Sequence, residues 1–572
     1  MKRLLMAAVA VIVTQFAGAA QAQQTFVDQG PLWNQTQRAG FYSQDQGSRL
    51  MPLKWIMALR QPNGGAAFMA DNLSRYGYLK NDQTPGATLP VGFTTNTDDQ
   101  GTVFAGMSCA ACHTRQIEVG GAAYRIDGGP AIVDFQSFMA DLDKAVQNIL
   151  SNQAAFNDFA AAVLGNGASQ QQILQLRSDV MLWFTPYDAI VKASLPTPGW
   201  GPSRLDAVAM IFNRLTGLDI GPANGGPPNQ GHLITKNIAI ADAPTRYPFL
   251  WNAAIQNKTQ WPGFAPNGDD LLAMVRNVGE VLGVFGRFYP TKDIIDLPNY
   301  KDNSVNIDGL LALETLITKI GPPKYQWPVD AALAKQGEEI YKWTIAQGAG
   351  CEGCHGIQVV ALPLGRPTWK TPVVNVGTDI HEWETLGRTV DTGVLKDTGI
   401  PHLKATDTSV NVLASSVVGI MAEHIGKIAT YDLDHTTGPA GTENLASRIG
   451  RVPAELAEAK QMASVKTQPG SYESRVMQGI WAAAPYLHNG SVPTLADLLS
   501  PASQRPASFK IGPNYDPTGK VGLAATQTRF DYTLQTTDCS KLNSGNSNCG
   551  HEFGTKLTPD QKKALLEYLK TL

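Results

Sequence analysis

The sequence has no large net charge, few cysteines and, beyond its first residues, no long hydrophobic run. In 572 residues, 46 Lys and Arg stand against 49 Asp and Glu, so no basic field indicates nucleic-acid binding. No apolar run after the N-terminus reaches the roughly 18 residues that a membrane span needs. Hydrophobic residues make up 43% of the chain, which is enough for more than one core. These features exclude a fibrous, membrane-embedded or nucleic-acid-coating protein.

The N-terminus has the pattern of a secretory signal peptide. Lys2 and Arg3 precede an apolar stretch over 4–13, and Ala20-Gln21-Ala22 has the small-x-small form of a cleavage site. The apolar stretch is too short to span a bilayer. We therefore expect a signal peptide over 1–22, cleavage near Ala22, and a periplasmic or secreted mature protein without a transmembrane anchor.

Four of the six cysteines form two copies of one motif. The motif C-x-x-C-H attaches c-type haem covalently, because two thiols one turn apart bond to the two vinyl groups of one porphyrin and the His is the proximal iron ligand. A redox dithiol does not need the His, and zinc would need further ligands at finger-like spacing, which are absent. The sequence therefore predicts two covalently bound haem c groups, held by Cys109, Cys112, His113, Cys351, Cys354 and His355.

The other two cysteines, Cys539 and Cys549, lie in a Ser/Asn/Gly-rich loop. In an exported protein they are expected to form a disulfide. His551 follows at once, so the disulfide would fix one imidazole in space. The alternative is a stabilising disulfide next to an ordinary surface histidine.

Helical spacing around the second motif is typical of a cytochrome c domain. The stretch 331–346 leads into the motif, and Thr558-Pro559-Asp560-Gln561 predicts a capped helix start before a leucine face. Further helical patterns lie at 133–150 and 170–194. We expect haem domains over 23–330 and 331–572, in a mainly α fold with long irregular loops and little sheet.

Segments spread over most of the mature chain resemble two related groups of proteins. The stretches 484–495 (APYLHNGSVPTL), 260–265 (QWPGFA) and 276–280 (RNVGE) are similar to the dihaem cytochrome c peroxidase superfamily, although the Asp and Arg of that family's FWDGRA stretch are missing. The stretches 109–114, 248–252, 276–285, 388–393 and 550–554 are similar to its rubber oxygenase A and oleate dihaem dioxygenase branch.

The resemblance implies several site features. It implies haem-dependent oxidation of an unsaturated fatty acid or polyisoprene, and in relatives a calcium ion lies between the domains. Glu280 occupies the position of the family's acidic distal-pocket residue. The GHxxG segment of the branch supports His551 as the distal ligand of the second haem, with His488 as the alternative; in the peroxidases the residue matching His488 is not an iron ligand.

The positions of the nine histidines predict different iron ligands for the two haems. Peroxidases carry a distal histidine soon after the first motif, whereas none occurs here between His113 and His232. This absence favours a first haem with an open sixth position, able to bind dioxygen or peroxide. The alternative is a remote histidine that reaches the iron. A second haem with two histidine ligands would suit electron transfer or tuning of the first.

Several residues are candidates around the first haem. Glu280 is the candidate proton donor or acceptor, and Trp261 the candidate electron relay between the haems. The alternatives are that Glu280 is a surface carboxylate and that Trp261 is an ordinary core tryptophan. The sequence predicts an apolar pocket over the iron, lined by Phe249, Trp251 and Phe264. The alternative is that all three are ordinary core residues. The candidates for pairing with haem propionates are Arg276 and Arg287. The alternative is that these arginines form surface ion pairs.

Three functions fit these features. The first is an oxygenase that joins dioxygen to an unsaturated hydrophobic substrate at the N-terminal haem. The second is a hydrogen peroxide reductase that receives electrons from a small redox protein through the second haem. The third is a dihaem electron carrier without catalytic activity, in which both irons are closed.

Overall fold

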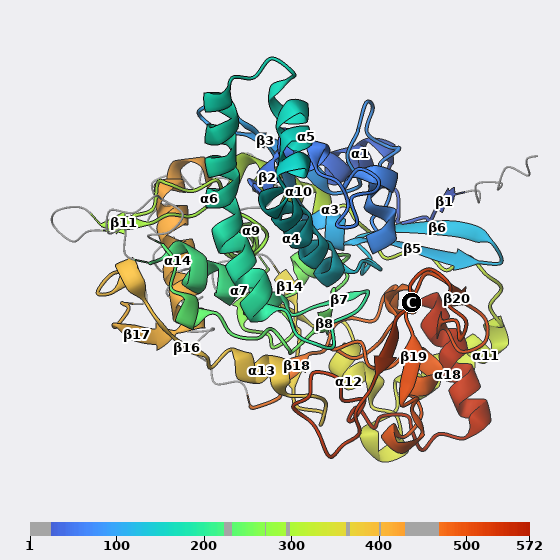
Figure 1. Ribbon diagram of the computed structural model, residues 1–572. Helices are drawn as coiled ribbons and strands as arrows, with labels where there is room; N and C mark the ends of the chain where they lie inside the picture. The colour runs from blue at the N-terminus through green and yellow to red at the C-terminus, as the bar shows by residue number, and fades with distance from the viewer. Residues whose placement is uncertain are drawn as a thin grey trace, which may run out of the picture.

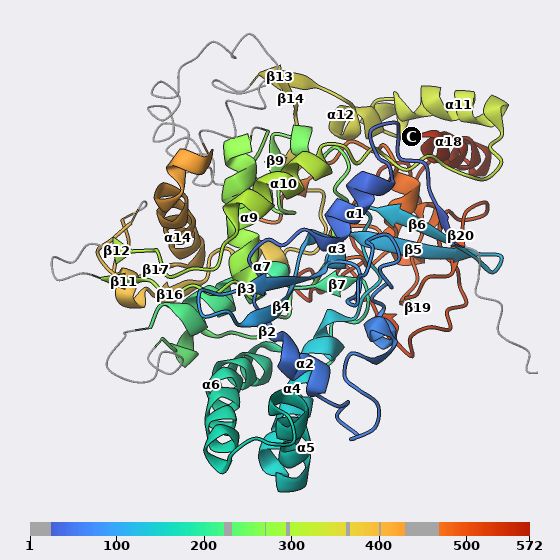
Figure 2. The same cartoon turned by 90° about the horizontal axis from the view of Figure 1, so that it is seen from above.

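The computed structural model describes residues 24–221, 232–268, 270–292, 298–361, 367–399, 402–428 and 468–572. The predicted signal peptide lies outside these residues. Helices α4, α5 and α6 form a lobe at one edge of the molecule, and helices α11 and α18 lie side by side at another (Figures 1 and 2). Within the described ranges, the helices of eight or more residues are α1 (Gln35–Ser43), α4 (Phe135–Ser151), α5 (Gln153–Leu164), α6 (Gln170–Ser194), α7 (Ala207–Arg214), α9 (Asp270–Gly283), α10 (Ile307–Ile317), α11 (Ala331–Tyr341), α14 (Ser409–Glu423) and α18 (Pro559–Thr571).

The expectation of a mainly α chain with little sheet is wrong. The described residues form ten small sheets, of which two have three strands and eight have two. The three-stranded sheets are β1 (Gln24–Phe26), β6 (Ala122–Asp127) and β5 (Thr114–Val119), and β2 (Met51–Pro52), β4 (Val103–Met107) and β3 (Phe93–Thr97). The pairs nearest the site are β7 (Arg204–Leu205) with β8 (Thr245–Arg246), β9 (Lys258–Thr259) with β10 (Ala265–Pro266), β13 (Val359–Ala361) with β14 (Pro367–Trp369), and β15 (Val373–Val374) with β18 (Tyr472–Glu473).

Most of these sheets could not be predicted from hydrophobic periodicity because their strands are short. Strands of two or three residues are too short to show the alternation that marks a half-buried strand. The longer hairpin of β5 and β6 does carry a local signal, because its two-residue turn is Gly120-Gly121 with φ of 59° and 84°. A type I′ turn requires positive φ at both positions, which favours glycine there.

The helices expected around the second motif are present. Thr558 caps α18 in a capping box with Gln561, with Pro559 at the first helical position, and Leu565 and Leu569 are buried. Helix α11 packs against α18 so closely that a Cβ at Gly337 would lie 2.0 Å from the Ala564 carbonyl oxygen. The helix predicted over 170–194 is α6, which begins with a second capping box.

The described residues pack into two hydrophobic cores. One core lies between α4, α5, α6 and the sheet of β2, β4 and β3. The larger core draws residues from both sides of position 330, among them Ile117, Leu310, Val417, Trp481 and Leu565. Helix α14 packs against α9 and α7 rather than against α11 and α18 (Figure 2). The boundary expected at residue 330 therefore does not separate two cores.

Candidate functional site

The first C-x-x-C-H motif is partly buried: its cysteines and histidine are half-buried, and the two residues between the cysteines are buried. It forms the short helix α3 (Cys109–Cys112), in which Ala110 and Ala111 are buried, and His113 follows at its C-terminal end. The His113 Nδ1–H donates to the Pro248 carbonyl oxygen at 2.8 Å. This bond fixes the ring orientation and leaves Nε2 as the nitrogen that can bind a metal.

The second motif has the same internal order but lies at the surface. It forms α12 (Cys351–His355), in which Glu352 and Gly353 are exposed. The His355 Nδ1–H donates to the Arg475 carbonyl oxygen at 2.7 Å, so this ring too presents Nε2. Three large apolar side chains near α12 are solvent-exposed: Ile345 at 67%, Ile357 at 50% and Val359 at 66%.

A cavity of about 1240 Å³, its mouth included, lies against the second motif. Cys351, Cys354 and His355 line it together with His551, and Leu495, Leu498, Leu499, Leu565 and Leu569 supply much of its apolar wall. The ring centres of His355 and His551 are 6.2 Å apart.

The residues around this cavity fit a haem with two axial imidazoles. A metal–imidazole nitrogen bond is about 2 Å long, so two imidazoles on opposite sides of one metal ion have ring centres roughly 6 Å apart. His551 Nδ1 is buried and has no hydrogen-bond partner among the described residues. The two thiols, the two imidazoles and the apolar wall together match what a covalently attached haem requires.

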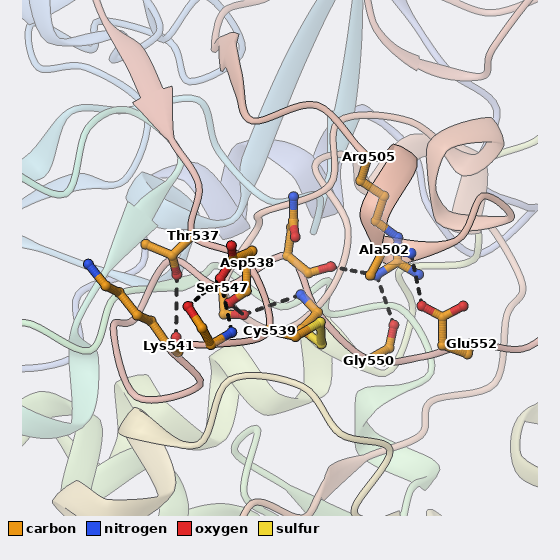
Figure 3. Close-up of a disulfide and its surroundings, with 12 residues drawn as sticks. Ala502, Arg505, Thr537, Asp538, Cys539, Lys541, Ser547, Gly550 and Glu552 are labelled. Atoms are coloured by element: carbon orange, nitrogen blue, oxygen red, sulfur yellow. Dashed lines mark hydrogen bonds between the residues drawn. A yellow bond between two sulfur atoms is a disulfide. The ribbon is translucent and has the colours of Figure 1, made fainter.

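The loop that carries His551 is held from several sides (Figure 3). Cys539 and Cys549 form a disulfide, as expected from the sequence. The Arg505 Nη1 donates to the carbonyl oxygens of Asn548 at 2.5 Å and Gly550 at 2.8 Å. Gly550 has a φ of 79°, and a Cβ there would lie 2.4 Å from the backbone of Gly377. These contacts fix the backbone on which His551 stands.

His488, the alternative ligand, lies on the wall of the same cavity but is engaged differently. Its ring stacks on Tyr472 with the ring centres 3.6 Å apart and the planes 13° apart. Burial lowers the pKa of His488 to about 3. The structure therefore brings both candidate histidines to the cavity, with His551 facing His355 and His488 stacked on a tyrosine.

No second imidazole meets His113 in the described part of the chain. The ring of His113 instead meets the ring of Tyr247, with centres 6.2 Å apart. Elsewhere His232 stacks on Tyr289, and His381 pairs with Asp242 at 2.7 Å. His435 lies outside the described residues.

Glu280 lies close to the first motif. Burial and, next, the charge of Glu280 raise the pKa of the Cys109 and Cys112 thiols to about 12. Glu280 itself stands in the last turns of α9, where its Oε1 accepts a hydrogen bond from Gln260 Nε2 at 2.8 Å. Burial raises the pKa of Glu280, while the nearby charge of Arg276 opposes this shift.

Two of the four aromatic candidates line the cavity of the second motif, not a pocket over the first iron. Phe249 directly follows Pro248, whose carbonyl holds His113; it lines the cavity of the second motif and stacks on Trp251 with ring centres 4.6 Å apart. Trp261 also lines that cavity and donates from Nε1 to the Arg246 carbonyl oxygen at 3.0 Å. Phe264 is half-buried just before β10 and is not part of the cavity wall.

The arginines expected at the propionates already have carboxylate partners. Arg276 pairs with Glu314 at 2.9 Å in a buried ion pair, and Arg287 pairs with Asp302 at 2.9 Å near the surface. For the expected calcium ion, the described residues contain no group of three or more Asp, Glu, His or Cys side chains arranged to hold a metal. No helix among the described residues is long and apolar enough to cross a bilayer.

Some groups that build the site have no signal in the sequence. The carbonyls that orient His113 and His355 belong to Pro248 and Arg475, 135 and 120 residues away. A backbone carbonyl is present at every residue, so no residue type marks it. Arg505 could have been considered as a partner of the loop, but its distance of 45 residues from Gly550 hides the contact.

Comparison with known proteins indicates a cytochrome c-like, haem-dependent oxidoreductase. Residues 471–510 match the family described as RoxA-like, cytochrome c-like. This segment supplies Tyr472, Arg475 and His488 to the cavity wall. The chain is 29% identical to the uncharacterized protein y4iJ of Sinorhizobium fredii, over 94% of this chain and 92% of that protein. It is 27% identical to the uncharacterized protein y4iM of the same organism, over 63% and 75% respectively.

Proposed function

We propose that this chain is an exported dihaem oxidoreductase that inserts dioxygen into an unsaturated hydrophobic substrate at its N-terminal haem. The substrate class is an unsaturated fatty acid or a polyisoprene. The observation that carries the proposal is the difference between the two motifs: His355 faces His551 at the spacing of two axial ligands, whereas His113 meets no second imidazole among the described residues.

The two motifs divide the work in this proposal. His355 and His551 would hold the second haem, which would then be closed to substrates and would serve electron transfer or tuning of the first. His113 would hold the first haem and leave room there for a small ligand. When bound, the haem supplies the metal centre at which dioxygen or hydrogen peroxide is activated.

The side chains around the first motif have separate tasks. Glu280 holds a proton at its carboxylate, and Gln260 orients that carboxylate by the bond to Oε1. Val278 and Leu282 on α9 are fully buried and help to exclude water. We assign Phe264 to the apolar substrate pocket.

The aromatic residues between the motifs form the route for electrons in this proposal. Trp261 and Phe249 line the cavity of the second motif, and Phe249 stacks on Trp251. Phe249 is also next to Pro248, the residue that orients His113. The chain of rings therefore extends from the second cavity toward the proximal side of the first haem.

Oxygen uptake by the purified holoprotein tests the oxygenase. Oleic acid or polyisoprene is added without peroxide or reductant, and products are analysed by mass spectrometry. We expect substrate-dependent uptake and a hydroperoxide or a cleaved alkene as the product. No uptake with either substrate, combined with peroxide-dependent oxidation of a reduced cytochrome, would replace the oxygenase by the peroxidase.

The variant Glu280→Gln tests the proton-holding group. It should lower turnover by roughly 10²–10⁴-fold while both haem spectra stay unchanged. Because burial raises the pKa of Glu280, a proton donor at this position loses activity as the pH rises through that pKa, and the variant loses this limb of the pH profile. Unchanged turnover would remove Glu280 from the mechanism. Asp302→Asn, at an exposed carboxylate, is the control.

A second function, hydrogen peroxide reduction, is favoured by the exposure of the second motif. Ile345, Ile357 and Val359 present apolar surface around α12, as expected where a small redox protein docks and passes electrons to a haem edge. Reduction of peroxide by a reduced donor cytochrome, without any oxygenated product, would support this function. High-spin or oxygen-bound haem would exclude the third alternative, a carrier with both irons closed.

A further inference from the structure

Arg115 is a fully buried arginine with an incomplete set of partners. It lies on β5, two residues after His113, and is 0% exposed. Its Nη1 donates to the Pro130 carbonyl oxygen at 3.1 Å, but Nε and Nη2 have no hydrogen-bond partner among the described residues. No described carboxylate lies within 4 Å of Arg115. An unpaired buried guanidinium is costly, so this group calls for an anion.

Arg246, beside the second motif, also lacks a carboxylate partner, although its Nη1 donates to the Tyr247 carbonyl oxygen at 3.5 Å. It ends β8, is 5% exposed and lines the cavity of the second haem motif. Its Nε donates to the Leu487 carbonyl oxygen at 3.0 Å, and its guanidinium carbon lies 4.7 Å from the ring centre of Trp261. Here too no described carboxylate lies within ion-pair distance. Burial lowers the pKa of Arg246 to about 9, and the charges of Arg475 and Arg115 contribute to the shift.

Neighbouring arginines show what a satisfied partner set looks like. Arg475 pairs with Glu473 at 2.8 Å, with both side chains less than 8% exposed. Arg276 pairs with Glu314 at 2.9 Å. Arg204 and Arg505, which are also buried, have no carboxylate partner but donate to backbone carbonyl oxygens. Arg115 differs from all of these because two of its guanidinium nitrogens have no partner among the described residues.

We propose that Arg115 and Arg246 bind haem propionate carboxylates, Arg115 those of the first haem and Arg246 those of the second. The inference rests on the proposed function, because it requires both haems. Each haem brings two carboxylates, and the planar guanidinium fork matches carboxylate geometry. Arg115 follows the proximal ligand of the first motif by two residues, and Arg246 stands on the cavity wall of the second.

The placement has a consequence for both haems. An arginine bound to a propionate places its positive charge close to the haem that carries that propionate. A nearby cation favours the reduced, less positive state of a haem. Both midpoint potentials are therefore raised by this pair.

The test uses the full-length holoprotein with Arg115→Gln and Arg246→Gln. The readouts are the propionate bending band in the resonance Raman spectrum and the midpoint potential of each haem. We expect Arg115→Gln to shift the band and lower the potential chiefly at the first haem, and Arg246→Gln to do so chiefly at the second. Arg287→Gln, at an exposed arginine with its own carboxylate partner, should match the wild type in both measurements.

The variants Arg115→Lys and Arg246→Lys cover the case in which a glutamine variant does not fold. Lysine keeps the positive charge but not the bidentate contact with a carboxylate. We therefore expect the midpoint potential to return closer to the wild-type value than the position of the Raman band does. Folded two-haem variants with wild-type bands and potentials would overturn the inference and leave the proposed function intact. A chain whose intact mass shows no attached haem would overturn both.

Discussion

The two C-x-x-C-H motifs have equally half-buried cysteines and histidines but differ in the exposure of the two residues between the cysteines. In each, the histidine Nδ1–H donates to a distant backbone carbonyl, Pro248 for His113 and Arg475 for His355. Ala110 and Ala111 in the first motif are buried, whereas Glu352 and Gly353 in the second are exposed. The internal geometry of the motif is thus constant, and what differs is how the fold covers it.

The difference on the distal side is larger still. A loop held by a disulfide and by Arg505 carries His551, whose ring centre lies 6.2 Å from that of His355. Around the first motif the described residues supply Glu280 on α9 instead of an imidazole. The comparison teaches that the attachment motif alone does not decide what an iron does. In the proposed function the side chains that face each motif decide it, and they come from segments far away in the sequence.

The largest expected effect is that of His113→Ala. If the chemistry takes place at the first haem, this variant should reduce oxygenase turnover to background while the second haem keeps its spectrum. Activity and the number of attached haems, from intact mass, are measured together. His402→Ala, at an exposed histidine, is the control. Full activity of His113→Ala would move the chemistry to the second iron and reverse the comparison.

The next effect is confined to the second haem. His551→Ala should convert that haem from low-spin to high-spin, since one axial imidazole is lost, and should leave the first haem unchanged. The electronic absorption and electron paramagnetic resonance spectra report this. His488→Ala is the matched variant on the same cavity wall and should stay low-spin, because its ring stacks on Tyr472. The reverse result for the two variants would assign the ligand role to His488.

Local signals predicted the parts of the fold that depend on neighbouring residues. The capping box of Thr558 and Gln561 is present, and α6 spans the predicted residues 170–194. The small sheets were not predicted, because strands of two or three residues show no period and pair with segments far away. The Gly120-Gly121 turn is a local signal for one hairpin, because a type I′ turn favours glycine at both positions.

The candidate site follows the same division. The attachment motifs and the cysteine pair are short spacings that can be read directly from the chain. The expectation that Arg276 and Arg287 pair with propionates fails to anticipate Glu314 and Asp302, which already pair with them. Whether an arginine is buried without a carboxylate depends on the whole fold, so Arg115 could not be singled out from the sequence.

The smallest effect sharpens the comparison at the loop of His551. Removing the disulfide with Cys539→Ser and Cys549→Ser together should lower the free energy of unfolding by about 2.5–3 kcal/mol, because the unfolded chain regains the entropy of a short closed loop. Chemical denaturation followed by circular dichroism measures it, with Lys541→Ala in the same loop as the control. Since the disulfide lies two residues before His551, the double variant should also weaken the low-spin signal of the second haem and spare the first. A loss of stability with both haem spectra unchanged would make the disulfide a general stabiliser, and Arg505 alone would then position the imidazole.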